Sequence, residues 1–368
     1  MRRLVLLGLE VLAVEECAVP EPGPGEILLS VKAATTCGTD LKAYLRGHPQ
    51  IPMPGPFGHE YSGVVEAAGE GAKFKPGDAV MGVHSAPCLA CEWCLRRQEN
   101  LCETIMATKV LGSFAEYLLI PKRIADLNVF PKPDSMSFER ACFLEPLACV
   151  AHGLECLFPQ GFGNRATEPP NVRTPNTENR NPENLSSETV LVIGPGAIGL
   201  LFVSALRPHG VTDITLAGRN RDKLAVGEAL GARTVFLSEL GSVPSTSLRA
   251  GGTWPSAGFD CVIECTGAPE IWERSVELVR RGGKVMFFGG CPSGTRVSFD
   301  AARLHYDQIT LLSPFHFGKS AVLRARDWLL DSTFVVEPLI SGERSLEEAS
   351  KVFEDLRAGM GIKYVFKP

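Results

Sequence analysis

The feature that most constrains the fold of this 368-residue chain is a buried strand that runs directly into a glycine-rich turn. Residues 190–193 of the strand 189–193 are apolar, and a helical pattern begins after the turn. Glycines at such a turn allow a tight backbone path, close approach of a pyrophosphate, and close packing of helix on sheet. The sequence therefore predicts a dinucleotide site, with a merely structural glycine turn as the alternative. The predicted site consists of Gly194, Pro195, Gly196, Ala197, Ile198 and Gly199.

Strands and helical patterns alternate along the second half of the chain. This alternation predicts a parallel sheet covered by helices on both faces, which is the doubly wound Rossmann type of α/β fold. The predicted strands are residues 189–193, 213–216, 260–263, 284–288 and 309–312, and helical patterns at 321–330 and 346–357 close the chain.

The first part of the chain, up to about residue 150, has short apolar runs that glycine and proline interrupt. Short strands with turn signals between them predict a compact, partly closed β domain. The chain is long enough for two domains, each with its own core. The apolar runs of the first domain are residues 27–31, 61–68, 78–83 and 114–120.

The residue at the end of the second Rossmann strand distinguishes the two nicotinamide dinucleotides. An NAD site has an acidic residue there for the ribose hydroxyls, whereas a 2′-phosphate requires a cation and no carboxylate. Here Gly218 occupies that position, and Arg219 and Arg221 follow it. Because the guanidinium fork of an arginine can bind a phosphate, the sequence favours NADP over NAD. In the alternative, both arginines are solvated surface charges.

Four cysteines at C-x2-C-x2-C-x7-C spacing predict a closed, structural zinc site. Two intervening residues let the backbone turn, so that successive thiolates meet at one tetrahedral centre. An iron–sulfur cluster is disfavoured because Glu103, not proline, follows the last cysteine and the last spacer is too long. A chance group of buried cysteines is the other alternative. The predicted ligands are Cys88, Cys91, Cys94 and Cys102.

A second set of metal-ligand types lies in three separated segments of the first domain. Cys37, His59, Glu60 and Glu145 offer a thiolate, an imidazole and two carboxylates. A catalytic zinc takes such donors and keeps one position open for water or substrate. Each residue alone would be interpreted as a packed core residue or as part of a turn. Together they predict a catalytic zinc.

The composition excludes several classes of protein. A hydrophobic content of 45%, a charged content of 21% and a net charge of -5 lack the basic excess that nucleic acid or an anionic membrane attracts. Twelve cysteines are too sparse in so long a chain for a disulfide scaffold, which indicates a reducing, cytoplasmic compartment. The N-terminus imitates a signal peptide, but Glu10, Glu15 and Glu16 interrupt it, so a strand and its partner are expected. No apolar stretch approaches the roughly 20 residues that cross a bilayer. We therefore expect chemistry on a small molecule.

With its motifs in this order, the chain resembles the zinc-containing medium-chain dehydrogenases across nearly its whole length. The resemblance is closest to the polyol branch, which includes sorbitol, threonine and glucose dehydrogenases. It rests on CGTD at 37–40, GHEYSGVV at 58–65, the cysteine run, LEPLACVAH at 144–152 and VLVIGPGAIGL at 190–200.

The resemblance implies an order of domains. A GroES-like β-barrel catalytic domain is expected at 1–152, with its structural zinc lobe at about 86–103. A Rossmann domain is expected at 153–298, interrupted by a polar insertion at 160–188 that family members lack. For that insertion an idle loop is favoured over a shield or a subunit contact. A return segment at 299–368 is expected to complete both domains.

The resemblance also implies roles for the residues around the catalytic zinc. Cys37 and His59 are the expected ligands, and Glu60 is either a direct ligand or an exchanging neighbour. Glu145 is either a further ligand or the anchor of the water on the metal. Asp40 is expected to hold the far nitrogen of His59, which fixes the imidazole toward the metal.

The implied reaction is reversible hydride transfer between NADP and a secondary alcohol of a polyol, sugar or amino-polyol, which gives the ketone. Thr39 is the expected first proton acceptor, and Thr266 is expected among the cofactor-binding residues. Many family members have a histidine five residues after the first zinc cysteine, where this chain has Lys42. The outer part of the proton relay therefore departs from the family.

Other interpretations remain beside this one. An NAD-dependent enzyme similar to L-threonine 3-dehydrogenase is the main alternative. A zinc-free reductase or a non-catalytic redox sensor should have lost some of the ligands or Thr39, and all are present.

The sequence says less about the residues around the site and about subunit association than about the zinc ligands. Tyr44, Phe57 and His316 are candidates to line the substrate pocket, but packing is favoured for each of them because aromatic residues at such places more often pack. Because family members are dimers or tetramers, a homodimer or homotetramer is expected, with residues 309–312 available to pair across a two-fold axis.

Overall fold

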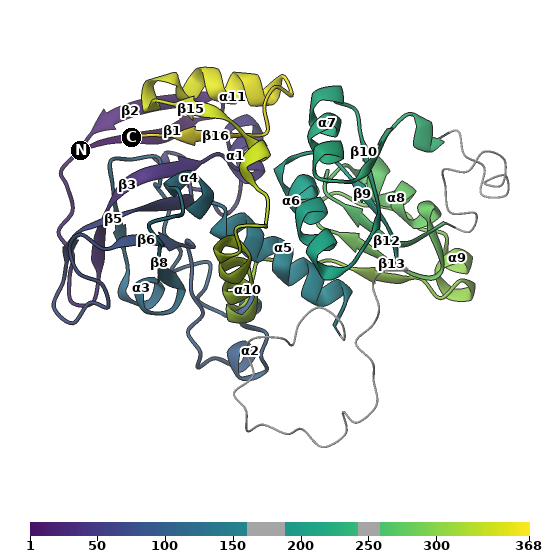
Figure 1. Ribbon diagram of the computed structural model, residues 1–368, viewed down its shortest axis with the longest axis horizontal. Helices are drawn as coiled ribbons and strands as arrows, with labels where there is room; N and C mark the ends of the chain where they lie inside the picture. The colour runs from purple at the N-terminus through teal and green to yellow at the C-terminus, as the bar shows by residue number, and fades with distance from the viewer. Residues whose placement is uncertain (160–187, 242–257) are drawn as a thin grey trace. The chain divides into compact units, whose positions relative to one another are not determined.

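Two large sheets organise the described residues, one in each of two units (Figure 1), and a smaller sheet belongs to the first unit. The computed structural model describes residues 1–159, 188–241 and 258–368. The first unit consists of Met1–Cys149 and His316–Pro368, and the second consists of Val150–Phe315. Apart from Glu188, the predicted insertion at 160–188 lies outside the described residues. In the described part of the chain, no helix has the length and apolar character needed to traverse a bilayer.

The second unit is built on a parallel sheet. Its strands are β9 (Thr189–Ile193), β10 (Asp213–Gly218), β11 (Arg233–Phe236), β12 (Phe259–Glu264), β13 (Val279–Phe287) and β14 (Thr310–Leu312). Its helices are α6 (Ala197–Leu206), α7 (Arg221–Ala229), α8 (Pro269–Leu278) and α9 (Ala301–Tyr306), with short 3₁₀ helices at Arg207–His209 and Glu239–Gly241.

The strand order of this sheet is β11-β10-β9-β12-β13-β14, and every neighbouring pair is parallel. Counted from β9, this is the order 3-2-1-4-5-6 of a doubly wound Rossmann sheet. Helices α6 and α7 contact β9 and β10, and α8 contacts β12 and β13 (Figure 1). Strands buried on both faces need apolar residues throughout, as Val190, Leu191 and Val192 show. The predicted fold of this unit is confirmed.

The first unit has a mainly antiparallel β architecture. Its strands are β1 (Arg2–Gly8), β2 (Val11–Glu16), β3 (Ile27–Thr35), β4 (Gly55–Pro56), β5 (Glu60–Ala68), β6 (Ala79–Gly82), β7 (Tyr117–Ile120), β8 (Val129–Pro131), β15 (Ile340–Arg344) and β16 (Lys363–Phe366). Its helices are α1 (Gly38–Arg46), α2 (Glu92–Leu95), α3 (Lys122–Asn128), α4 (Phe138–Ala141), α10 (Lys319–Leu330) and α11 (Ala349–Arg357). Helix α5 (Leu144–Leu157) contains the boundary between the units, and 3₁₀ helices lie at Glu99–Leu101, Glu337–Leu339 and Leu346–Glu348.

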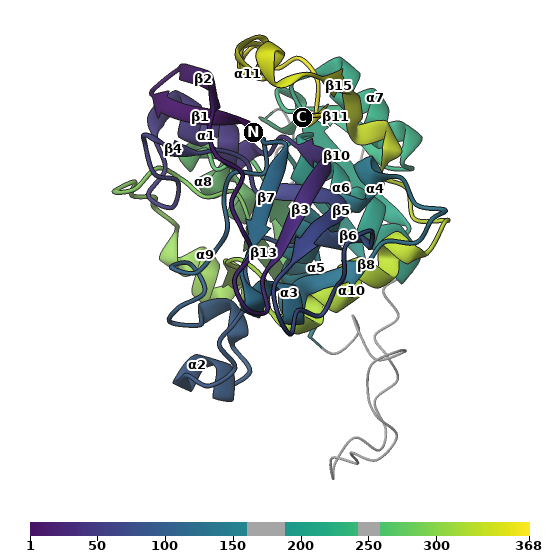
Figure 2. The ribbon, with the colours of Figure 1, turned by 90° about the vertical axis from the view of Figure 1, so that its left-hand side faces the viewer.

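Strand β3 is the centre of the larger sheet in this unit. It pairs with β5, β7 and β16, in the order β15-β16-β3-β5-β6-β8 with β7 added at β3 (Figure 2). Strands β2, β1 and β4 form a smaller sheet. Strand β16 comes from the end of the chain. The return segment, residues 299–368, therefore serves both units. It first supplies α9 and the edge strand β14 to the second unit, and from His316 onward it completes the first unit.

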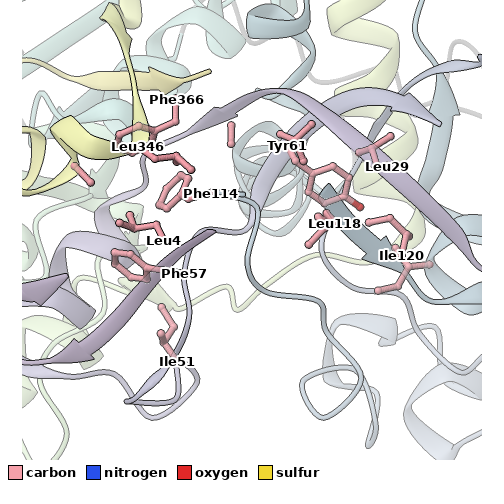
Figure 3. Close-up of a cluster of buried hydrophobic side chains, with 14 of the residues drawn as sticks. Leu4, Leu29, Ile51, Phe57, Tyr61, Phe114, Leu118, Ile120, Leu346 and Phe366 are labelled. Carbon is pink, nitrogen blue, oxygen red and sulfur yellow. The ribbon is translucent and has the colours of Figure 1, made fainter. Parts of the chain in front are cut away.

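The core of the first unit contains two of the residues that were candidates to line the substrate pocket. Tyr44 and Phe57 both pack in the hydrophobic core (Figure 3 shows Phe57). Their ring centroids lie 5.2 and 5.3 Å from that of Phe353, and Phe57 also meets Phe114 edge to face at 5.7 Å. An aromatic ring that is fully buried, as Phe57 is, contributes by removing apolar surface from water. Core packing, which the sequence favoured over a place in the pocket, is confirmed for these two residues.

A buried arginine fastens the C-terminal part of the first unit to α4. The Nε and Nη2 atoms of Arg140 donate to the carbonyls of Leu329, Asp331 and Phe334 at 3.1, 2.9 and 2.8 Å. Its Nη1 donates to Glu337 Oε1 at 2.6 Å. The planar guanidinium of Arg140 thus supplies hydrogen-bond donors to backbone carbonyls at the end of α10 and in the loop that follows it.

We expect Arg140→Met to lower the free energy of unfolding by about 3 kcal/mol, because it leaves several acceptors without a donor. Chemical denaturation followed by fluorescence measures the change. Arg357→Met is the matched control, since its side chain is 56% exposed in its pair with Glu10. The control should cost less than about 1 kcal/mol. Equal losses in the two variants would contradict the role given to Arg140.

Candidate functional site

The end of β3 and the start of α1 place the first metal-ligand candidate. Cys37 is the N-cap of α1, and its Sγ accepts a hydrogen bond from the Thr39 backbone N–H at 3.4 Å. The Asp40 side chain accepts one from the Cys37 N–H at 3.0 Å. This reciprocal capping box satisfies N–H groups that the first turn of a helix leaves free. It also holds the Cys37 sulfur in one position.

His59 and Glu60 enter the site at the beginning of β5. Ligand atoms of Cys37, His59 and Glu60 all lie within 4.8 Å of one another. The Nδ1 atom of His59 lies 3.1 Å from Asp40 Oδ1, so that Nε2 is the nitrogen left for a metal. The structure thus brings together donors from two segments that the sequence separates.

Glu60 is held from its other side by partners that the sequence analysis did not identify. Its Oε2 accepts hydrogen bonds from Thr35 Oγ1 and Lys363 Nζ, and both Glu60 and Lys363 are almost completely buried. Its Oε1 is buried without a partner among the described residues. Burial raises the pKa of Glu60 to about 7, although the Lys363 ammonium opposes this shift. The unsatisfied oxygen is the one available to a metal ion.

The charges around His59 fit a divalent cation. Burial lowers the pKa of His59, but the charge and hydrogen bond of Asp40, together with Cys37, raise it well above its ordinary value. Several anionic groups buried around one imidazole are unstable unless a cation compensates them. A thiolate, an imidazole and a carboxylate are donors that zinc accepts. The residues present therefore fit a zinc ion.

Glu145 lies beside this set but is engaged elsewhere. Its Oε1 is 3.3 Å from His84 Nδ1 and 3.8 Å from the sulfur of Cys149, whose thiol donates to it. Burial alone would raise the pKa of Glu145, but the hydrogen bond and charge of His84 and the charge of His59 lower it to about 2. The structure groups Cys37, His59 and Glu60 as potential ligands, and it leaves the role of Glu145 as a prediction.

Polar side chains continue from the metal-ligand set along one wall. The rings of His59 and His84 have centroids 5.2 Å apart, and His316 follows at 5.4 Å from His84. The Nε2 atom of His316 is 2.7 Å from Ser85 Oγ, a hydrogen bond that fixes the ring. His316 thus lies in a row with His84 and His59, and its contact with the substrate stays a prediction.

The four cysteines of the spaced run form a separate, closed cluster. Their sulfur atoms all lie within 4.8 Å of one another, with Cys91 and Cys94 at 3.5 Å. Hydrogen bonds from backbone N–H groups lower the pKa values of Cys88 and Cys91, whereas burial raises that of Cys94 to about 12. Metal binding displaces the remaining thiol protons, and four thiolates leave zinc no open position. The fourth ligand is Cys102, whose Sγ accepts from the Cys88 N–H at 3.2 Å.

The glycine turn after β9 has the geometry of a dinucleotide site. Gly194 has a φ of 109°, which side chains avoid, and a Cβ at Gly199 would lie 2.0 Å from the Gly194 carbonyl oxygen. In contrast, a Cβ at Gly196 would meet no atom within 4 Å. Gly196 is also the N-cap of α6, where free N–H groups and the helix dipole favour an anion. The turn is tightly packed behind and open in front, as a pyrophosphate requires.

The residues expected around the rest of the dinucleotide lie at the carboxyl ends of the central strands. Gly218 ends β10, and a Cβ there would lie 2.3 Å from the Pro195 ring. The Arg221 guanidinium covers the Phe236 ring, with its centre 5.7 Å from the ring centroid. Arg219 is exposed and forms no ion pair with any residue that the structure describes. The methyl group of Thr266 would contact a Cβ at Gly194 at 2.9 Å, which places it behind the turn.

Comparison with known proteins agrees with both units. Residues 23–134 match the model of the alcohol dehydrogenase GroES-like domain, and residues 197–331 match that of the zinc-binding dehydrogenases. D-altritol 5-dehydrogenase from Agrobacterium fabrum is 32% identical over 83% of this chain and 81% of its own length. The chain belongs to the zinc-containing medium-chain dehydrogenases.

Two further relatives cover nearly the whole dehydrogenase. L-threonine 3-dehydrogenase from Deinococcus deserti is 27% identical over 94% of this chain and 93% of its own length. A zinc-binding dehydrogenase from Sinorhizobium meliloti, solved with NADP bound, has a TM-score of 0.84 and 28% identity, and covers 100% of this chain and 99% of its own. The similarity therefore includes both units and the order in which they occur.

Family membership confirms the two zinc sites at Cys37, His59 and Glu60 and at the four cysteines, and it implies a nicotinamide cofactor. The sequence analysis of this dehydrogenase missed His84 and Lys363, which hold Glu145 and Glu60. One signal was present for Lys363, since it stands beside the apolar run of residues 364–366 in a strand buried at every position. A lysine in such a strand requires a partner.

The two zinc sites should respond differently to loss of a ligand. Cys91→Ser should lower the melting temperature and the content of structural zinc, because the lobe then lacks one of its crosslinks. Cys37→Ser should abolish activity and remove the catalytic zinc while the melting temperature changes little. Elemental analysis and calorimetry measure both properties. Loss of folding in Cys37→Ser, or full thermal stability in Cys91→Ser, would contradict this assignment.

Proposed function

We propose that this enzyme uses NADP to interconvert a secondary alcohol of a polyol, sugar or amino-polyol and its ketone. The observation that carries the proposal is the juxtaposition of Cys37, His59 and Glu60 with the polar wall of His84 and His316. A pocket for simple aliphatic alcohols needs an apolar wall, whereas hydroxyl groups beside the reacting carbon need hydrogen-bond partners. The activity named for the Agrobacterium relative, on D-altritol, supports the same class.

The preference for NADP is supported by the end of β10. Gly218 has no side-chain carboxylate that could accept hydrogen bonds from the ribose hydroxyls. The next residue, Arg219, is an exposed cation. The bound NADP of the Sinorhizobium structure supports the same choice by similarity. The stacked position of Arg221 on Phe236 leaves its N–H edge able to bind a phosphate oxygen.

Arg219→Gln should lower kcat/KM for NADP about 10- to 100-fold and leave that for NAD unchanged, because one charge-assisted bond to the 2′-phosphate is lost. Arg281→Gln, a surface arginine of the same unit that is 84% exposed, is the control. Steady-state rates with both dinucleotides give the comparison. If wild type prefers NAD, or if both cofactors suffer equally, the proposal for NADP is wrong.

Gly218→Asp should shift the preference toward NAD, but the added Cβ must displace the Pro195 ring. Gly218→Ala has this steric effect without the carboxylate, so it is the matched control. We expect an improved ratio of NAD to NADP only in the aspartate variant, measured as the two kcat/KM values. An equal shift in the alanine variant would attribute the change to the turn instead.

In the proposed mechanism, a zinc ion held by Cys37, His59 and Glu60 would supply a Lewis acid for the substrate oxygen, and a nicotinamide held at the glycine turn would supply the hydride acceptor or donor. The protein's own side chains position the metal ligands and transfer the proton. Asp40 fixes the His59 ring and the Cys37 backbone, and Thr35 and Lys363 fix Glu60. The hydroxyl of Thr39, in the first turn of α1 next to the Cys37 sulfur, accepts the proton of the substrate hydroxyl and at the same time gives its own proton to solvent, so that it stays neutral.

Thr39→Val should lower kcat about 100-fold or more, because the hydroxyl that accepts the proton is replaced by a methyl group of similar size. Thr39→Ser should restore most of the rate. Zinc content and NADP affinity, measured by elemental analysis and fluorescence titration, should remain those of wild type in both variants. A valine variant as fast as the serine variant would exclude Thr39 from proton transfer.

The identity of the substrate class is tested by following absorbance of the reduced nicotinamide with polyols, sugars, amino-polyols and L-threonine. Turnover of a polyol or sugar supports the proposal, and turnover of L-threonine alone favours the threonine dehydrogenase alternative.

The predicted homodimer or homotetramer is compatible with the parallel sheet of the second unit. Strand β14 is the edge of this sheet among the described strands, and its outer backbone groups can pair with a second copy.

A further inference from the structure

A group of cations lies at one border of the catalytic zinc site in the first unit. We call it the basic rim, and define it by Lys42 and Arg46 of α1, His48 of the following loop, and Lys109. The loop is closed by a hydrogen bond from the Ile51 N–H to the His48 carbonyl at 3.0 Å. The assigned machinery of zinc binding, proton transfer and cofactor binding uses none of these four residues.

Lys109 connects this loop with the wall of the site. Its Nζ donates to Gln50 Oε1 at 3.3 Å and to the Met106 carbonyl at 3.0 Å. The next residue, Val110, donates its N–H to the His84 carbonyl at 2.7 Å. The His84 ring is in turn 5.2 Å from that of His59, so the segment that contains Lys109 is joined through His84 to a zinc ligand.

Two residues of the rim, Lys109 and His48, have donors that their hydrogen bonds do not use. An ammonium has three N–H groups, and Lys109 bonds to two acceptors among the described residues. The Nδ1 atom of His48 accepts from the Gln50 N–H at 3.2 Å, so that in the neutral ring the proton is on Nε2. Gln50 contacts both side chains, and each of them retains a donor for an added acceptor group.

Lys109 of the rim also has no compensating carboxylate among the described residues. No carboxylate lies within ion-pair distance of Lys109 in residues 1–159, 188–241 or 258–368, and burial alone lowers its pKa. Burial lowers the pKa of His48 as well, and the charges of Lys42, His59, Arg46 and Lys109 lower it further. A half-buried ammonium among other cations is unfavourable unless an anion approaches it.

We infer that the basic rim binds an anionic group of the substrate, a phosphate or a carboxylate carried away from the reacting hydroxyl. The inference rests on the proposed function, since it names the polyol class more closely as polyol phosphates or hydroxy acids. Neutral polyols lack the group that Lys109 and His48 can bind. The rim thus selects the substrate and positions its hydroxyl at the zinc ligands, without a part in hydride transfer.

The test compares matched alcohols at saturating nicotinamide cofactor. Glucitol is the neutral probe, glucitol 6-phosphate is the phosphate probe, and gluconate and L-threonine are the carboxylate probes. Wild type should show kcat/KM at least about 10-fold higher for one of the anionic probes than for glucitol, as a charge-assisted hydrogen bond predicts. The preferred anion identifies which of the two sources fits. Equal or better use of glucitol would overturn the inference and leave the proposed function intact.

The variant test separates binding from chemistry. Lys109→Gln should lower kcat/KM for the anionic probe about 10- to 100-fold, mainly through KM, and should leave glucitol unchanged. Lys75→Gln, at an exposed position of the same unit, is the matched control. A decrease of the same size for glucitol would indicate a structural role and overturn the inference.

Binding of inorganic phosphate gives a readout that does not depend on turnover. Calorimetric titration with phosphate, in the presence of saturating NADP so that the nucleotide site is filled, should show binding to wild type and to Lys75→Gln. The affinity should fall about 10-fold or more in Lys109→Gln. Unchanged phosphate binding in this variant would contradict the rim as an anion site. If no alcohol is oxidised while this binding pattern holds, the proposed function fails and the anion site remains.

Discussion

The catalytic site depends on a single buried carboxylate, that of Asp40. One of its oxygens accepts the Cys37 N–H at 3.0 Å, and the other lies 3.1 Å from Nδ1 of His59. The first contact belongs to the capping box that begins α1, and the second fixes the tautomer and direction of an imidazole ligand. Helix initiation and metal-ligand orientation therefore share one side chain. Because the side chain is completely buried, neither contact can be replaced by water.

A second constraint ties the site to the far end of the chain. Lys363 is separated from Glu60 by 303 positions, and its ammonium also donates to the Thr36 carbonyl at 2.6 Å. These contacts exist only after β16 has paired with β3. A buried ion pair is favourable only while both partners are present, so the ligand Glu60 depends on the return of the C-terminal strand. This dependence explains why the N-terminal β domain is completed by the last residues.

The sequence predicted those parts of the site that local patterns determine. Four cysteines at fixed spacing and a glycine turn after an apolar strand are local signals, and both were interpreted correctly. The partners His84 and Lys363 depend on strand register between distant segments, which no local pattern contains. For Phe57 the sequence left a pocket position open beside the favoured core packing, because an aromatic residue near a loop has the same pattern in both cases. Long-range packing decides between these cases.

The close approach of Gly218 and Pro195 couples two parts of the dinucleotide site, the part that binds the ribose and the part that binds the pyrophosphate. A side chain at 218 would occupy the space of the Pro195 ring, 2.3 Å from its Cγ. Pro195 belongs to the turn whose front is open at Gly196, so displacing it changes the pyrophosphate site as well as the ribose site. Substitutions at residues in contact are not additive. A substitution at Gly218 is thus expected to act on the turn as well as on the strand end, and its effect on dinucleotide preference includes both.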